Sequence, residues 1–246
     1  MAIKPIYLLA DSQLLFWKEN DRLFMERVKE DLDSPEPKAA YLGASNGDQP
    51  EYYDLFEAAM EQIGLSNRRM IPWSPSDEDT AFLKEADLIL LAGGDVNRGW
   101  RTFQQNGVKD VLTNRRFDGV VMIGVSAGAV QLGMGAVLEP PSNGRADGKQ
   151  DGGAGESVEE IVGEIKDKFE TFRFAPFYVG AHDEANEWQG LRRLVAGSTE
   201  ETRGIGISSG GGAIYSSDGT LEPIRKPLAQ FLKEADRVSE SLLIPE

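Results

Sequence analysis

The segment VVMIGVSAGAVQL, residues 120–132, places a serine at the point where a buried strand gives way to a helix. Residues 120–123 are all apolar and predict the strand, and residues 130–132 predict the helix that follows. Small residues on both sides of Ser126 permit a sharp, strained turn that lifts the hydroxyl clear of the sheet. We therefore predict a nucleophilic serine at this turn. The alternative is a tight packing turn whose serine only caps the helix.

A second glycine-rich loop follows the preceding predicted strand, residues 88–92. Its sequence is Ala92-Gly93-Gly94-Asp95, and ligands of open parallel sheets bind at the carboxyl ends of strands. Adjacent glycines let the backbone approach a substrate carbonyl closely. The N–H groups of Gly94 and Ala127 would then form an oxyanion hole. The alternative is an ordinary turn into a helix that begins near Val96.

His182 is the one histidine among 246 residues. It closes a predicted strand, residues 174–181, so it is expected at the same rim of the sheet as Ser126. A lone histidine is more often structural than catalytic. Beside a serine nucleophile, however, it is the single imidazole able to act as general base. The chain has no cysteine, which excludes disulfides, thiolate metal sites and cysteine nucleophiles.

Short apolar runs alternate with helical patterns through the first half of the chain. A helix is expected over residues 52–63, where the apolar positions share one face, and another is expected to begin at Ser76. This alternation predicts parallel strands covered by helices on both faces, in a single α/β domain over residues 1–246. The buried strands are expected at residues 6–10, 39–44, 70–73, 88–92 and 120–125.

The second half follows a different pattern. Residues 139–157 hold two prolines and five glycines among polar side chains, which predicts a loop that covers or borders the active site. A helix is expected over residues 184–195. Closing strands are expected at residues 204–208, 213–216 and 220–224.

Composition excludes several classes of function. The chain has 26 Lys and Arg against 41 Asp and Glu, a net charge of −15, which argues against binding nucleic acid or an anionic membrane surface. No window approaches the ~18 apolar residues of a membrane span. A cytoplasmic protein without cofactor is expected. A metal site is not expected, because the single histidine and the scattered carboxylates lack ligand spacing.

Several motifs together resemble one known family. They are Gly-x-Ser-Ala-Gly-Ala after a buried strand, Ala-Gly-Gly-Asp one unit earlier, Tyr52–Phe56 in a helix, and a histidine followed by a helix that carries Arg-Arg-Leu. This combination, spread over residues 38–216, is similar to the aspartyl dipeptidase (dipeptidase E) and cyanophycinase family of serine peptidases. The resemblance implies a three-layer α/β/α sandwich with a mainly parallel, flavodoxin-like sheet, related to class I glutamine amidotransferases.

The same resemblance implies a reaction. It implies hydrolysis of a peptide or isopeptide bond beside an aspartyl residue, with Ser126 as nucleophile and His182 as base. Gly94 and Ala127 would supply the oxyanion donors. The expected partner is thus a small peptide or isopeptide, and a homodimer stays open. An α/β-hydrolase esterase is a weaker alternative, because its histidine normally lies near the C-terminus.

The chain departs from the family pattern in its third triad member. The family places an acidic residue after the strand that here covers residues 204–207, whereas this chain has Ser208 and Ser209. Three nearby acids could replace it, namely Asp183, Glu184 and Glu187. Otherwise the site is a Ser–His dyad, or the protein is a non-catalytic binding protein on the same fold.

An aspartyl substrate would require a cation at the site, because the chain is strongly acidic. An arginine can hold a carboxylate with two parallel hydrogen bonds. The alternative is that the arginines near the site pair with surface acids and contribute little. The candidates for binding the substrate are Asp95, Arg98, Arg101, Arg192 and Arg193.

Overall fold

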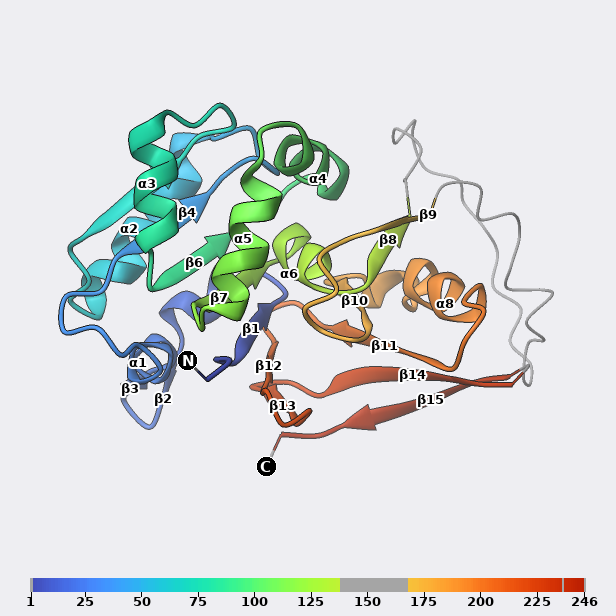
Figure 1. Cartoon of the computed structure of the whole chain (residues 1–246). Coiled ribbons are helices and arrows are strands. Elements are labelled where there is room, and N and C mark those ends of the chain that lie inside the picture. Colours follow the sequence, from blue (N-terminus) through green and yellow to red (C-terminus); the bar gives the residue numbers. More distant parts are fainter. Residues whose placement is uncertain (1, 138–167, 236, 246) are drawn as a thin grey trace.

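A seven-stranded sheet forms the centre of the computed structural model (Figure 1), which describes residues 2–137, 168–235 and 237–245. The strand order is β13-β12-β1-β7-β6-β4-β5. Strands β1, β7, β6, β4 and β5 run parallel to one another. Strand β12 runs antiparallel to β1, and β13 runs antiparallel to β12. The bounds are β1 Ile6–Leu9, β4 Ala39–Leu42, β5 Arg68–Ile71, β6 Leu88–Leu91, β7 Val121–Val125, β12 Gly212–Tyr215 and β13 Leu221–Ile224.

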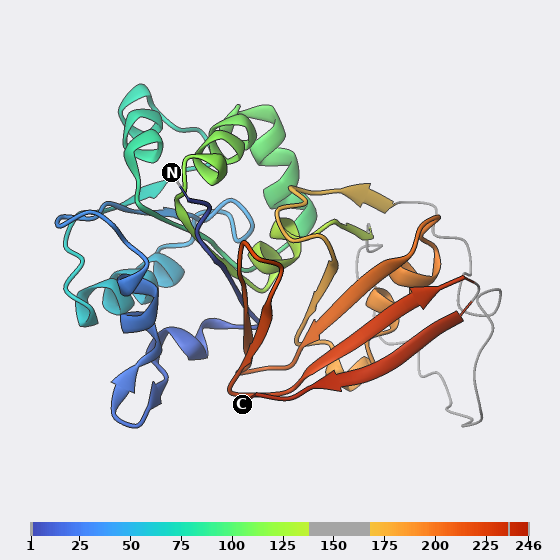
Figure 2. The ribbon, with the colours of Figure 1, turned by 60° about the horizontal axis from the view of Figure 1, so that its bottom comes forward.

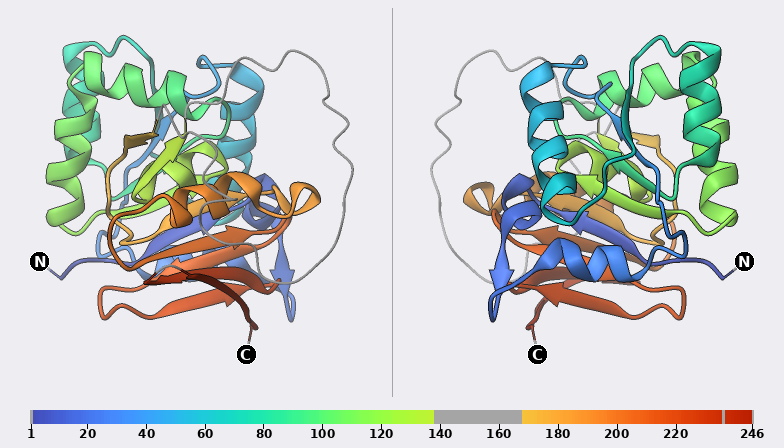
Figure 3. Two further views of the ribbon diagram at one scale, coloured as in Figure 1. Left: turned by 90° about the vertical axis from the view of Figure 1, so that its right-hand side faces the viewer. Right: turned by 90° about the vertical axis from the view of Figure 1, so that its left-hand side faces the viewer.

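Helices cover both faces of this sheet (Figure 3). In β1, Ile6 and Leu8 pack into the core on one face while Tyr7 and Leu9 pack into the core on the other. Such two-sided burial explains the uninterrupted apolar runs in the sequence. The α/β/α architecture predicted above is therefore confirmed. One face carries α1 Phe24–Glu30 and α2 Pro50–Gln62, and the other carries α3 Asp77–Glu85, α4 Val96–Gln105, α5 Val108–Phe117 and α6 Ala127–Leu132.

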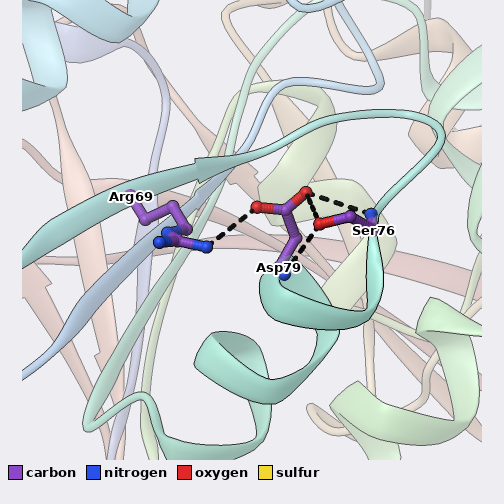
Figure 4. A network of polar contacts seen from close by, with 3 residues as sticks. All are labelled: Arg69, Ser76 and Asp79. Atoms are coloured by element: carbon purple, nitrogen blue, oxygen red, sulfur yellow. Dashed lines mark hydrogen bonds and ion pairs between the residues drawn. The ribbon is translucent and has the colours of Figure 1, made fainter.

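The start of α3 shows how local sequence sets an element boundary (Figure 4). The Ser76 hydroxyl accepts a hydrogen bond from the Asp79 N–H at 3.2 Å, and the Asp79 carboxylate accepts from the Ser76 N–H at 3.0 Å. Arg69 lies 3.2 Å from the same carboxylate. Burial alone would raise the pKa of Asp79, but the hydrogen bonds from Ser76 and the charge of Arg69 outweigh it and lower the pKa. The helix begins where the sequence predicted.

A second sheet lies against the first and was not anticipated (Figure 2). Its Val179, Ile205 and Ile207 join the core of the central sheet, while α8, Gln189–Ala196, covers its opposite face through Leu191 and Val195. The expected strand at residues 204–208 belongs to this sheet and not to the central one. Its strands are β10 Tyr178–Ala181, β11 Thr202–Ile207, β14 Leu228–Glu234 and β15 Arg237–Leu243.

The helix expected over residues 184–195 is interrupted. Glu187 and Trp188 have φ values of 51° and 59°, so left-handed backbone separates a short 3₁₀ turn from α8. The loop predicted over residues 139–157 lies outside the described residues. The remaining elements are β2 Lys18–Glu19, β3 Arg22–Leu23, β8 Gly135–Val137, β9 Lys168–Glu170, η1 Ser12–Phe16 and η2 Glu184–Asn186.

Within residues 2–137, 168–235 and 237–245, no helix has the length and apolar character needed to cross a membrane.

Candidate active site

Ser126 occupies a strained turn between β7 and α6. Its φ of 50° and ψ of −110° are rare for a residue with a side chain. The Ser126 N–H donates to the Leu9 carbonyl on β1 at 2.8 Å, and the Ser126 carbonyl accepts from Val130 N–H on the first turn of α6. The backbone is thus held on both sides of the residue. The hydroxyl stands half-buried at the carboxyl edge of the central sheet.

Two glycines allow this turn to pack. A Cβ at Gly128 would lie 2.1 Å from the Leu91 carbonyl oxygen, and a Cβ at Gly124 would lie 2.6 Å from the Ala129 nitrogen. Real Cβ atoms do not approach backbone atoms so closely, so α6 can begin directly against β6 only with glycine at these positions. The Gly-x-Ser-x-Gly pattern therefore has a steric cause in this structure.

His182 reaches the serine from the second sheet. It follows β10 directly, has a φ of 45°, and donates its N–H to the Ile207 carbonyl at 2.9 Å. Its ring Nε2 lies 2.7 Å from the Ser126 Oγ. At this distance, an imidazole that carries its proton on Nδ1 accepts the serine hydrogen at Nε2. The structure thus brings together the two residues singled out from the sequence.

The loop after β6 borders the serine on another side. A Cβ at Gly93 would lie 3.2 Å from the Ser126 Cβ. Gly94 has a φ of 130°, and a Cβ there would lie 2.3 Å from the Ser45 carbonyl oxygen, so a side chain is excluded. Within the described chain, no hydrogen bond uses the N–H of Gly94 or of Ala127. Both amides, predicted as oxyanion donors, therefore have no hydrogen-bond partner among residues 2–137, 168–235 and 237–245.

Gln131 links the serine helix to the Gly94 loop, a role that the sequence interpretation missed. Its side chain is fully buried, and its Nε2 donates to the Val96 carbonyl and to the Ser45 Oγ, each at 3.0 Å. The Ser45 carbonyl in turn accepts the Asp95 N–H at 2.8 Å. The signal in the sequence was a glutamine on the buried face of the helix after Ser126. The amide nitrogen thus has two partners, whereas Gln131 Oε1 is buried and accepts no hydrogen bond from the described residues.

Two of the three candidate acids hydrogen-bond to groups other than the imidazole. Asp183 Oδ1 accepts from the Asn186 side chain at 2.8 Å, and Glu184 Oε1 accepts from the Ser209 N–H at 3.0 Å. Glu187 sits at the end of η2 in left-handed backbone. Glu184 thus lies beside Ser209, in the segment where the resemblance leads us to expect an acid. There it accepts a hydrogen bond from the backbone N–H of Ser209. The identity of a third triad member stays a prediction.

A cavity of about 600 Å³ opens beside Ser126 and His182. Asp95, at the start of α4, lines it, and the Asp95 carboxylate accepts the Arg98 N–H at 2.8 Å as a helix cap. Most of the other lining residues are small or apolar. The lining also includes the polar residues Asn97 and Asp183, and its small or apolar residues are Gly94, Val96, Ala127, Val130, Ala136, Val137, Val179, Gly180, Ala181, Gly190, Leu191 and Leu194.

None of the four predicted substrate arginines lines this cavity. Arg101 borders a different cavity between α4 and β9. Arg192 forms an ion pair with Glu240 on β15, and Arg193 lies exposed on α8. Arg98 contributes its backbone N–H to the cap of α4. The structure therefore does not place these arginines in the lining of the cavity beside Ser126.

Comparisons with known proteins agree with this architecture. The structure is similar to a peptidase from an acI-B1 Actinobacterium, with a TM-score of 0.64 and 14% identity over 99% of this chain and 95% of that one. It is also similar to a putative peptidase E protein from Listeria monocytogenes EGD-e, with a TM-score of 0.60 and 15% identity over 91% of this chain and 99% of that one. At these identities the likeness shows the fold.

Sequence comparison identifies the family. The uncharacterized peptidase YgaJ of Bacillus subtilis (strain 168) is 25% identical over 117 residues, which are 47% of this chain and 51% of that protein. The chain thus spans about half the length of this curated relative. The model of peptidase family S51 matches residues 6–140, more than half of the 246 residues, and the match includes the Ser126 turn. The chain therefore belongs to peptidase family S51, a family of serine peptidases.

Proposed function

We propose that this protein hydrolyses a peptide bond through an acyl-enzyme on Ser126. The observation that carries the proposal is the 2.7 Å contact between Ser126 Oγ and His182 Nε2 at a strained turn. A serine hydroxyl is a weak nucleophile until a base removes its proton, and this contact places a base within reach. Membership of family S51 supports the same chemistry.

The reaction follows from these atoms. As Ser126 Oγ attacks the carbonyl carbon, its proton passes to His182 Nε2, and the N–H groups of Gly94 and Ala127 stabilise the oxyanion. The imidazolium then gives this proton to the leaving amine as the carbon–nitrogen bond breaks. In the second half, the neutral imidazole takes a proton from water, whose oxygen attacks the ester. The imidazolium then gives this proton to Ser126 Oγ as the bond between Oγ and the acyl carbon breaks, which releases the carboxylic acid and restores the serine hydroxyl.

A hydrogen bond from an acid would hold the imidazole in the tautomer that this reaction requires. Asp183 and Glu184 hydrogen-bond other groups in the structure. The proposal therefore rests on the serine and histidine and leaves the third triad member, for which Glu187 is also a candidate, as a prediction. Family membership removes the α/β-hydrolase esterase alternative.

The resemblance further implies a bond beside an aspartyl residue or an isopeptide. Family membership supports this finer expectation. The lining of the cavity does not, because none of the predicted arginines reaches it. The proposal therefore concerns the hydrolysis of a peptide bond.

A fluorophosphonate probe tests the catalytic proposal directly, because it phosphonylates only activated serines. We expect stoichiometric labelling at Ser126, found by peptide mass spectrometry, with none in Ser126→Ala and a rate at least about 100-fold lower in His182→Ala. The exposed Ser217→Ala variant, remote from the site, is the matched control and should label normally. Labelling that persists in Ser126→Ala, or a folded wild-type protein that does not react, would favour the non-catalytic binding protein instead.

A further inference from the structure

The segment between His182 and α8 is short, and its end is strained. Residues 183–188 connect the histidine to the helix, and both Glu187 and Trp188 have left-handed backbone, with φ values of 51° and 59°. Residues with a side chain rarely adopt this conformation, and two in succession are held there only by their surroundings. The segment also closes on itself, since the Trp188 N–H donates to the Asp183 carbonyl at 3.2 Å. The position of Trp188 therefore sets where the segment after His182 ends.

Trp188 packs on two glycines of the second sheet. Gly180 on β10 and Gly206 on β11 lie opposite each other in the parallel ladder. A Cβ at Gly206 would lie 2.7 Å from the indole ring, and a Cβ at Gly180 would lie 3.3 Å from it. Because neither strand carries a side chain at this point, the indole lies directly on the backbone of the sheet and is only 6% exposed. Burial of the indole thus offsets the strain of its left-handed backbone.

The same two glycines adjoin the backbone that carries the imidazole. Gly180 precedes His182 by two residues. Gly206 directly precedes Ile207, whose carbonyl accepts the His182 N–H at 2.9 Å. The distance from His182 Nε2 to Ser126 Oγ is 2.7 Å, and a displacement of about 1 Å would break this hydrogen bond and slow the reaction. The contact between the indole and the sheet therefore lies where it can control the position of the base.

We infer that Trp188 is a positioning residue for His182. It holds residues 183–188 against β10 and β11, so that the imidazole stays within hydrogen-bond distance of Ser126. The inference rests on the proposed function, in which His182 is the base. An acid that hydrogen-bonded the ring would fix its tautomer and rotation, whereas Trp188 fixes the main chain that carries the ring.

The single histidine makes its position measurable without any activity. Untagged protein labelled with ¹⁵N-histidine gives one imidazole spectrum by NMR, and Ser126→Ala should shift its Nε2 signal because that nitrogen loses the nearby hydroxyl. We expect Trp188→Phe to move the wild-type signal and to make it insensitive to Ser126→Ala. The matched control is Phe231→Leu, at a residue of the same apolar cluster that lies opposite Gly204 on β11. This control should leave the imidazole signal unchanged.

Kinetics test the same role in the reaction. A panel of dipeptides with different side chains is screened for one that the wild-type protein hydrolyses. We expect Trp188→Phe to lower kcat and the rate of fluorophosphonate labelling about 10- to 100-fold, with KM nearly unchanged. In the His182→Ala background, Trp188→Phe should lower the residual labelling rate no further, because a positioning residue acts only through the residue that it positions. Phe231→Leu should keep the wild-type kcat.

A second variant displaces the indole from the side of the sheet. Gly206→Ala places a methyl group 2.7 Å from the ring, so we expect a similar loss of kcat. The double variant Gly206→Ala, Trp188→Phe should be no slower than Trp188→Phe alone, because the smaller ring leaves room for the methyl group.

The outcomes separate this inference from the proposed catalysis. An unchanged imidazole signal in Trp188→Phe, an equal change in Phe231→Leu, or a further loss of labelling in the His182→Ala background overturns the positioning role. A wild-type protein that neither labels nor hydrolyses any dipeptide, but whose imidazole signal still moves in Trp188→Phe, would overturn the proposed catalysis alone.

Discussion

The turns that carry Ser126 and His182 share a backbone feature but are held by different forces. Each residue directly follows a strand, β7 or β10, and each has positive φ, 50° and 45°. The serine turn is fixed by close backbone packing, since Gly128 leaves no room for a Cβ against Leu91. The histidine turn is exposed and is fixed by hydrogen bonds, including the one from its N–H to Ile207.

This difference indicates how each turn responds to change. A turn that is held by close packing has no room for a larger side chain, so a larger residue there must displace the backbone. A solvent-exposed turn that is held by hydrogen bonds can replace them with hydrogen bonds to water, so a substitution there costs little stability. We therefore expect substitutions around the serine turn to act on the whole fold and those around the histidine turn to act mildly.

The largest effect is expected for Gly128→Ala. The added methyl group would lie 2.1 Å from the Leu91 carbonyl oxygen, so α6 must move away from β6. We expect a loss of about 3 kcal/mol in the free energy of unfolding, measured by urea denaturation. Gly190→Ala is the matched control, because its methyl group meets nothing within 4 Å and alanine favours a helix. Equal stability of the two variants would show that the serine turn is not sterically fixed.

A smaller effect, confined to activity, is expected for Gln131→Met. Methionine fills the same space but cannot donate to the Val96 carbonyl or to Ser45 Oγ. The Gly94 loop would then lose its link to the serine helix, and we expect kcat to fall about 10- to 100-fold with KM nearly unchanged. Steady-state kinetics on the best dipeptide measure this. The exposed Gln189→Met variant should keep wild-type kcat, and an unaltered kcat in Gln131→Met would exclude a positioning role.

The smallest effect is expected for Glu184→Gln, on the histidine turn. Burial alone would raise the pKa of Glu184, but hydrogen bonds from backbone N–H groups, including that of Ser209, and the nearby Lys226 lower it overall. A lowered folded pKa gives stability that is present above the unfolded pKa of about 4.3 and is lost as the pH falls through the folded value.

The difference in Tm between wild type and Glu184→Gln should therefore be small but measurable at pH 7 and should shrink towards pH 3. Differential scanning calorimetry across this range measures it. Glu200→Gln, at an exposed glutamate beyond α8, serves as the control for the removal of one surface charge. A difference that grows as the pH falls would contradict the lowered pKa.

The same contrast explains what could be predicted from the sequence. The turn at Ser126 was predictable because its steric requirement appears as glycines at fixed spacing. Strands β1, β4, β6 and β7 were predictable because both their faces are buried. His182 could be predicted because the sequence holds no other imidazole. These features are either local in the sequence or follow from the presence of a single histidine, so no tertiary information was needed to predict them.

Long-range pairing could not be predicted in this way. Strand β11 pairs with β10 and β14 and not with the central sheet, which no apolar pattern in residues 202–207 reveals. The partners of Gln131 lie 35 and 86 positions away in the chain. Whether the side chains of Arg101 and Arg192 face the cavity depends on how α4 and α8 are rotated against their sheets, and residue spacing alone does not determine that rotation.

The position of β1 has a consequence for how the protein is made. This strand precedes both of its partners in the chain, because it pairs with β7 and with β12, whose Gly212 lies opposite Leu9. A nascent chain cannot complete the sheet until residue 212 has been synthesised, and the carbonyl that holds the Ser126 N–H lies on this same strand. Contacts of such sequence separation slow folding. The central sheet, and with it the strand that holds the serine turn, is therefore expected to be complete only after residue 212 has been synthesised.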